Sequence, residues 1–175
     1  MKSERALAWL VFGAWLLGAF ALQALLARGA RSQWFPELGL VFLFALLARM
    51  EERDAWIAGA LAALLRSAFA SEPPLVQLAG TLGFALAVIA LRSSLEIGAP
   101  LLRAAATILC VFACDLWLYL ACAARAWWAR GSLDGWEAPL LPLLLIALTS
   151  GLVSFAAAPL FVHLPGLGPL RSRKW

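Results

Sequence analysis

Charged residues are scarce in this sequence of 175 residues. They make up 14% of the chain, against 64% for hydrophobic residues, and residues 6–26 contain no charged side chain. A segment of that length crosses a hydrocarbon core of roughly 30 Å at about 1.5 Å per residue. A soluble domain of this size has no interior that could bury several such segments. The composition therefore excludes a soluble domain and predicts a single transmembrane domain over residues 1–175.

Side chains suited to metal binding or catalysis are also few. The chain has one histidine, His163, and three cysteines that share one apolar segment, Cys110, Cys114 and Cys122. No second cluster completes a zinc site, and cysteines placed in this way are typical of small packing residues. Motifs of serine hydrolases, zinc proteases and phosphate-binding loops are absent from the sequence. We therefore expect no enzymatic activity, no metal and no cofactor.

The net charge of +4 does not indicate a nucleic-acid-binding protein. The basic residues stand one or two at a time beside apolar segments, whereas a phosphate-binding patch gathers them on one face. Their distribution is typical of residues that set membrane topology and contact lipid headgroups. We expect membrane lipids, and no nucleic acid, among the partners.

Six apolar segments follow one another, separated by short turns that hold charged residues or prolines. The expected transmembrane helices cover residues 6–26, 36–48, 55–70, 75–91, 100–122 and 138–162. The second is short for a spanning helix, and prolines in the sixth predict a tilt or kink. The stretch between the fifth and sixth, residues 123–136, is expected to be the most polar interior loop.

The basic residues predict the orientation of these six segments. With both termini on one side, that side holds nine of them: Lys2, Arg5, Arg49, Arg53, Arg92, Arg103, Arg171, Arg173 and Lys174. The other side holds four: Arg28, Arg31, Arg125 and Arg130. Because cytoplasmic loops carry the excess of lysine and arginine, both termini are expected in the cytoplasm.

Two ionisable residues lie inside apolar segments, Arg66 in the third and Asp115 in the fifth. A charge near a bilayer centre costs about 2.5 kcal/mol or more, so it normally has a partner or a function. In the predicted topology both segments run in the same direction, and the two residues fall at depths of roughly 17 and 22 Å. We therefore expect, as a hypothesis, an intramembrane ion pair between them.

Two alternatives to the ion pair stay open for Arg66. Its long side chain could snorkel to the outer surface beside Glu72. Alternatively, a charge in the membrane could couple transport to an ion gradient. A double charge swap of Arg66 and Asp115 separates both alternatives from the ion pair.

Small residues recur at helical spacing in the third and fourth segments. These candidate helix-packing faces consist of Ala55, Gly59, Ala63, Gly80 and Gly83. Small side chains let membrane helices approach closely. Packing within this protein is the favoured interpretation, and a docking groove for a partner is the alternative.

One run of residues resembles a known family. The run from Pro36 to Leu47, PELGLVFLFALL, is similar to the second helix of the bacterial rod shape-determining protein MreD family. The charged turn after it, the small residues that follow, and a basic tail after a Leu-Pro turn are also similar. The resemblance covers residues 36–92 and the tail. Two positions depart from the family: Arg66 stands where an acidic residue is common, and Pro73-Pro74 replaces a glycine-containing turn.

The resemblance implies a non-enzymatic scaffold or regulatory subunit of the cell-elongation machinery, which makes peptidoglycan and sets cell shape. Its implied location is the bacterial cytoplasmic membrane. The implied partners are a bitopic protein like MreC and, through it, a SEDS glycosyltransferase and its penicillin-binding protein. The family also suggests a bundle like the substrate-binding S components of energy-coupling factor transporters. Such a vitamin-binding component is the alternative function, although it needs a polar pocket that opens outward.

Overall fold

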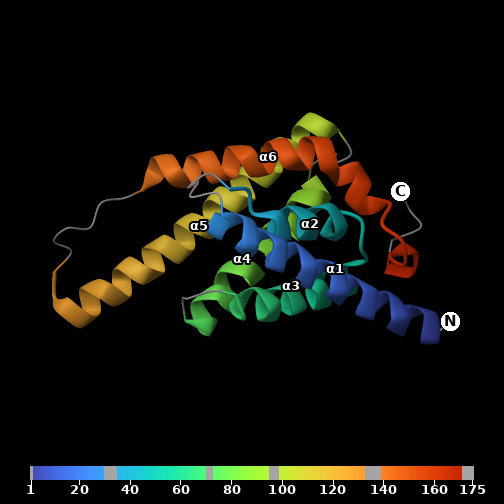
Figure 1. Ribbon diagram of the computed structural model, residues 1–175, viewed down its shortest axis with the longest axis horizontal. Coiled ribbons are helices and arrows are strands. Elements are labelled where there is room, and N and C mark those ends of the chain that lie inside the picture. The colour runs from blue at the N-terminus through green and yellow to red at the C-terminus, as the bar shows by residue number, and fades with distance from the viewer. Residues whose placement is uncertain (1, 30–34, 70–72, 95–98, 133–138, 171–175) are drawn as a thin grey trace.

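The regular structure of this chain is helical throughout the part described by the computed structural model, residues 2–29, 35–69, 73–94, 99–132 and 139–170. Six α-helices and a final 3₁₀ turn follow one another in these ranges (Figure 1). They are α1 (Lys2–Gly29), α2 (Leu38–Leu47), α3 (Glu52–Ser67), α4 (Pro74–Ser94), α5 (Pro100–Arg130), α6 (Leu140–Val162) and η1 (Gly168–Leu170).

Four of the described helices are long and apolar enough to cross a membrane. The qualifying stretches are Ser3–Ala27, Pro74–Arg92, Pro100–Arg130 and Leu140–Ala157. The sequence predicted six spanning helices, and the two others, α2 and α3, have 10 and 16 residues. At about 1.5 Å per residue, α2 is roughly 15 Å long, which is half of a hydrocarbon core.

Helix α2 is the centre of the bundle. All nine residues from Gly39 to Leu47 are buried, and α2 contacts each of the other five α-helices. Its aromatic side chains make several of these contacts. The Phe42 ring stacks on Phe12 of α1 at 6.0 Å and meets Phe161 of α6 edge-on at 5.7 Å. Because apolar side chains surround it on all sides, α2 has no lipid-facing stripe, and its uniformly apolar sequence reflects burial in protein.

The helix boundaries differ from the predicted ones mainly at α3 and α5. The charged turn expected between residues 48 and 55 is wrong in its second half, because α3 begins at Glu52. Acidic side chains in the first turn of a helix interact favourably with the positive end of its macrodipole. This explains why α3 begins among acidic residues. The predicted polar loop after residue 122 is also wrong in its first half, because α5 continues to Arg130.

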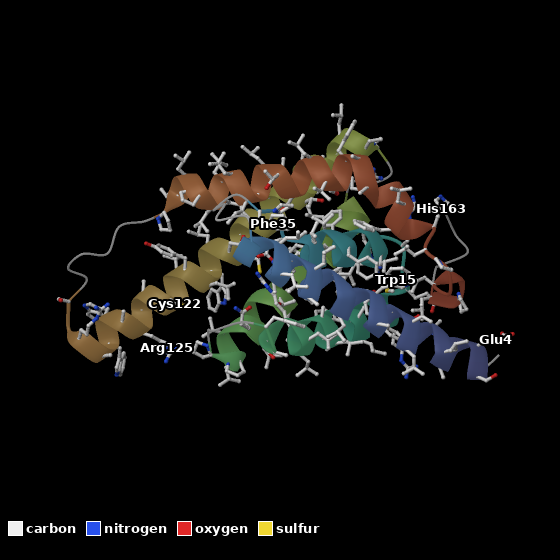
Figure 2. All side chains as sticks on the ribbon, in the orientation of Figure 1. Glu4, Trp15, Phe35, Cys122, Arg125 and His163 are labelled. Carbon is white, nitrogen blue, oxygen red and sulfur yellow. The ribbon has the colours of Figure 1, made fainter. Side chains whose placement is uncertain are left out.

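The extension of α5 follows from local propensity. Alanine and arginine are strong helix formers and dominate this stretch. The helix ends where Gly131 adopts a left-handed conformation, with φ of 73°, and donates its N–H to the Trp127 carbonyl at 2.7 Å. Figure 2 shows Arg125 on the part of α5 that projects beyond the other helices.

The first and last described elements lie together. The 3₁₀ turn η1 packs against α1 at the same end of the molecule as the start of the chain (Figure 1). Gly166, at φ of 84°, makes this approach possible, because a Cβ there would lie 2.9 Å from a side-chain carbon of Val11.

Candidate functional site

The Arg66 side chain points into the protein. Arg66 follows Ala62 and Ala63, which are fully buried, and it shares their face because it lies one helical turn further along. Its exposed fraction is 7%. Snorkelling to the outer surface is therefore wrong, since a snorkelling guanidinium would reach water.

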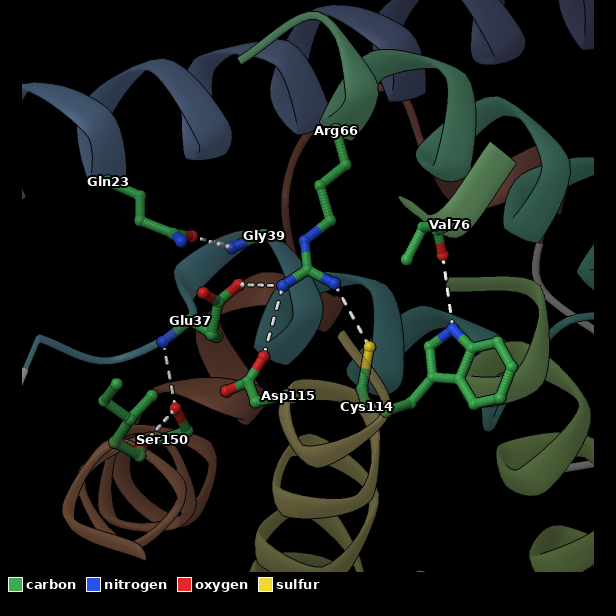
Figure 3. A network of polar contacts seen from close by, with 10 residues as sticks. Gln23, Glu37, Gly39, Arg66, Val76, Cys114, Asp115 and Ser150 are labelled. Carbon is green, nitrogen blue, oxygen red and sulfur yellow. Dashed lines mark hydrogen bonds and ion pairs between the residues drawn. The ribbon is translucent and has the colours of Figure 1, made fainter. Parts of the chain in front are cut away.

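The structure brings Arg66 and Asp115 together, as the ion-pair hypothesis expects. Nη2 of Arg66 lies 3.3 Å from Oδ1 of Asp115. The same nitrogen lies 3.2 Å from Oε2 of Glu37, and Nη1 lies 3.1 Å from Sγ of Cys114 (Figure 3). One guanidinium thus links α3, the start of α2 and α5. We call Glu37, Arg66 and Asp115 the inner triad.

Glu37 is the member of the triad that the sequence did not identify. It stands between Pro36 and an apolar helix, a position expected at the membrane surface. In the structure its side chain is 16% exposed, because the chain just before α2 runs inside the bundle. One sequence feature could have identified Glu37: it is an acidic residue at the start of an apolar segment that is too short to span a membrane.

Side chains from two other helices satisfy the backbone at the start of α2. The N–H of Glu37 donates to Oγ of Ser150 in α6 at 2.9 Å, and the N–H of Gly39 donates to Oε1 of Gln23 in α1 at 3.2 Å (Figure 3). A helix start leaves N–H groups without intrahelical partners, and in a membrane protein such groups need partners from the protein. These two bonds explain how the start of α2 can lie in the interior.

An arginine from α4 satisfies the other end of α2. Nη1 of Arg92 donates to the carbonyl of Leu47 at 3.2 Å and to the carbonyl of Met50 at 2.5 Å. A cation at a helix C-terminus also interacts favourably with the negative end of the macrodipole. Both ends of the central helix are therefore fixed by side chains of the surrounding helices.

A cavity of about 450 Å³ adjoins the inner triad, and all three of its residues line it. The polar side chains of Gln23, Gln77 and Tyr119 add to its wall. Ligand sites of proteins commonly have volumes of about 300–1,000 Å³ and combine apolar walls with a few polar groups. The cavity is therefore the best candidate for a binding site in the described chain.

The Asp115 carboxylate is only partly satisfied. Oδ1 faces Arg66, whereas Oδ2 is buried and has no hydrogen-bond partner among the described residues. Leaving such an oxygen unpaired costs about 1–3 kcal/mol, and more when it is charged. An arrangement of two carboxylates on one guanidinium can hold three helices together and can accept a further donor.

The small residues of α3 pack against α4. Ala55 and Ala63 are fully buried, and a Cβ on Gly59 would lie 2.7 Å from the Cβ of Ala85. Gly80 faces Trp117 of α5, while a Cβ on Gly83 would meet nothing within 4 Å. The face of α3 thus serves helix packing within the chain, whereas Gly80 and Gly83 line a second cavity of about 350 Å³ between α4 and α5.

The cysteines and the histidine form no common site. Cys110, Cys114 and Cys122 are free thiols, of which the first two are buried. His163 is exposed, in the turn after α6. Among the described residues, no group of three or more metal-ligating side chains is arranged to hold an ion.

Comparison of the chain with family models, with curated proteins and with solved structures finds no match.

Proposed function

We propose that this chain is a non-enzymatic, multi-pass subunit of the bacterial cytoplasmic membrane that acts by packing against other membrane proteins of the cell-elongation machinery. The observation that carries the proposal is the place of one sequence run in the fold. The run that resembles MreD is α2 with the two residues before it, and α2 is the buried centre on which all other α-helices pack. The resembling residues are therefore the ones that organise the molecule.

The surface of the chain supports the same proposal. Large apolar side chains are exposed on several outer helices, including Leu10 of α1, Leu101 of α5 and Leu152 of α6. Such faces are suited to lipid and to the helices of partner proteins. The proposed partners are membrane lipids and a bitopic protein like MreC, which in turn binds a SEDS glycosyltransferase and its penicillin-binding protein.

The proposed topology has both termini in the cytoplasm. The excess of basic residues on the terminal side supports it, and so does the packing of η1 on α1, which keeps the two ends of the described chain together. In this arrangement the start of α2 is directed toward the outer side, and the inner triad lies in the outer half of the membrane.

Photo-crosslinking in a rod-shaped bacterium tests the proposal. A photoreactive phenylalanine at Leu152, which is 69% exposed, should crosslink to a single-span periplasmic protein, whereas the same group at the buried Leu43 should not. Loss of the chain should round the cells. Unchanged cell shape after its loss, with no crosslink from Leu10, Leu101 or Leu152, would overturn the proposal.

The cavity favours a second candidate function, the substrate-binding S component. Glu37, Gln23, Gln77 and Tyr119 supply polar groups in addition to the two expected from the sequence. Purified protein that binds a vitamin tightly, and cells that lose vitamin uptake but keep their shape without it, would favour this function over the scaffold.

A further inference from the structure

We propose that the cavity beside the inner triad binds a primary ammonium group attached to an apolar body. The inference rests on the charge, the unpaired acceptor and the wall of this cavity, and it holds for a scaffold as well as for a solute-binding subunit.

The charge of the cavity wall favours a cation. Its charged residues are Glu37, Arg66 and Asp115, so two carboxylates face one guanidinium. Nη2 of Arg66 donates to both carboxylates, and Nη1 donates to Sγ of Cys114. With both acids ionised the site carries one uncompensated negative charge, which a bound cation would neutralise in the membrane interior. An anion would find no free cation among these residues.

The unpaired acceptor favours a group that carries N–H donors. Oδ2 of Asp115 is buried without a hydrogen-bond partner among the described residues. A primary ammonium has three donors and no acceptor, so it can bond this oxygen and still reach the carboxylate of Glu37. A quaternary ammonium has no N–H donor and would leave Oδ2 unsatisfied. The site should therefore discriminate between the two.

The volume and the apolar wall require more than an ammonium alone. Phe20, Leu118, Leu143 and Ile146 line the cavity, whose volume of about 450 Å³ leaves room for more than an ammonium group. Apolar surface of this kind gains from contact with alkyl groups. Two sources carry the required chemistry: the ethanolamine headgroup of a lipid and a free alkylamine.

Cys122 provides a native reporter of occupancy. It lines the cavity and is partly exposed, while the other two cysteines are buried. It lies seven residues after Asp115, on the same face of α5. The rate at which methyl methanethiosulfonate, a neutral thiol reagent, modifies Cys122 in the full chain can be followed by mass spectrometry. A bound ligand should lower this rate.

Hexylamine is the probe, with hexanol and hexyltrimethylammonium as matched controls, in phosphatidylglycerol nanodiscs. At about ten times its dissociation constant, hexylamine should slow the modification of Cys122 roughly tenfold by mass action. Hexanol and the quaternary amine should have little effect. Equal protection by hexanol and hexylamine would show an apolar cavity only, and no protection by hexylamine would show that Asp115 needs no cation; either result overturns the proposal.

Two variants test which residues bind the ammonium group, and nanodiscs of a second lipid test whether the group comes from a lipid or from a free amine. Asp115→Asn and, independently, Glu37→Gln should abolish the protection by hexylamine, whereas Glu52→Gln, at an exposed position of α3, should keep it. Protection that survives both site variants would overturn the proposal. In phosphatidylethanolamine nanodiscs, slow modification without added amine identifies the lipid headgroup as the ligand. Fast modification there, slowed by hexylamine, identifies a free amine.

Discussion

Helix α3 makes ionic contacts with its neighbours at both ends, and the arginines of the two contacts differ in burial. At its start, Nη2 of Arg5 in α1 lies 2.7 and 2.6 Å from the two oxygens of Asp54, and the arginine side chain is 49% exposed. At its end, Arg66 lies in the inner triad with 9% of its side chain exposed. We call the first contact the outer pair.

The difference in burial between Arg5 and Arg66 predicts that removing them lowers the free energy of unfolding by different amounts. The Arg5 side chain is half exposed, so water already competes for its charge and the outer pair contributes little. A buried charge that loses its partner cannot be solvated, and breaking such a pair costs much more. The distances do not predict this order, because the outer pair is the shorter one. Burial, and the number of groups that share one cation, should determine which end of α3 fixes the fold.

Removing the cation of the inner triad should have the largest effect. Arg66→Met leaves Glu37 and Asp115 buried without a cation, and we expect a loss of about 3–5 kcal/mol in the free energy of unfolding. Unfolding of the purified protein in detergent, titrated with SDS, measures it. Neutralising the acids in the same chain, with Glu37→Gln and Asp115→Asn, should recover most of the loss. Failure of the triple variant to recover would show that the arginine acts through packing alone.

Exchanging the charges tests whether the two sequence-predicted residues act as a pair. Arg66→Asp and Asp115→Arg should each destabilise the protein strongly. The double variant should recover about 0.5–3 kcal/mol relative to the sum of the single losses, the range for residues in contact. Recovery should be incomplete, because Glu37 would face the new acid at position 66. A strictly additive double variant would count against the pair.

A glycine between the two ionic contacts tests how closely α3 must approach α4. Gly59→Val places a Cβ 2.7 Å from that of Ala85, and we expect a loss of about 1–3 kcal/mol from overpacking. Gly83→Val is the matched control, because a Cβ there meets nothing within 4 Å. Equal stability of the two variants in the same SDS titration would mean that α3 and α4 separate easily.

The partnership of Arg66 and Asp115 could be predicted from the sequence because both are charged residues inside apolar segments. Such residues need compensation, and residue counting sets their depths. The short length of the second segment was visible too. Its consequence, a helix buried on all sides, was not, because burial depends on the other five helices.

Glu37 could not be assigned to the site from sequence for a related reason. The side chains that let the chain enter the bundle before α2, Gln23 and Ser150, lie on α1 and α6. No local pattern links them to Glu37. The end of α5 was misjudged because its arginines and tryptophans resemble an interfacial loop, although its alanines favour a helix.

The smallest effect should come from the outer pair. Arg5→Met removes a contact whose arginine is half exposed, and the acid that it leaves, Asp54, stands in the first turn of α3, where the helix macrodipole stabilises a carboxylate. We expect the midpoint of the SDS titration to change much less than for Arg66→Met. The change should shrink further in high salt, which screens exposed charges and leaves the buried triad largely unaffected. An outer-pair loss as large as that of Arg66→Met, and insensitive to salt, would show that Asp54, with a side chain only 4% exposed, behaves as a buried charge.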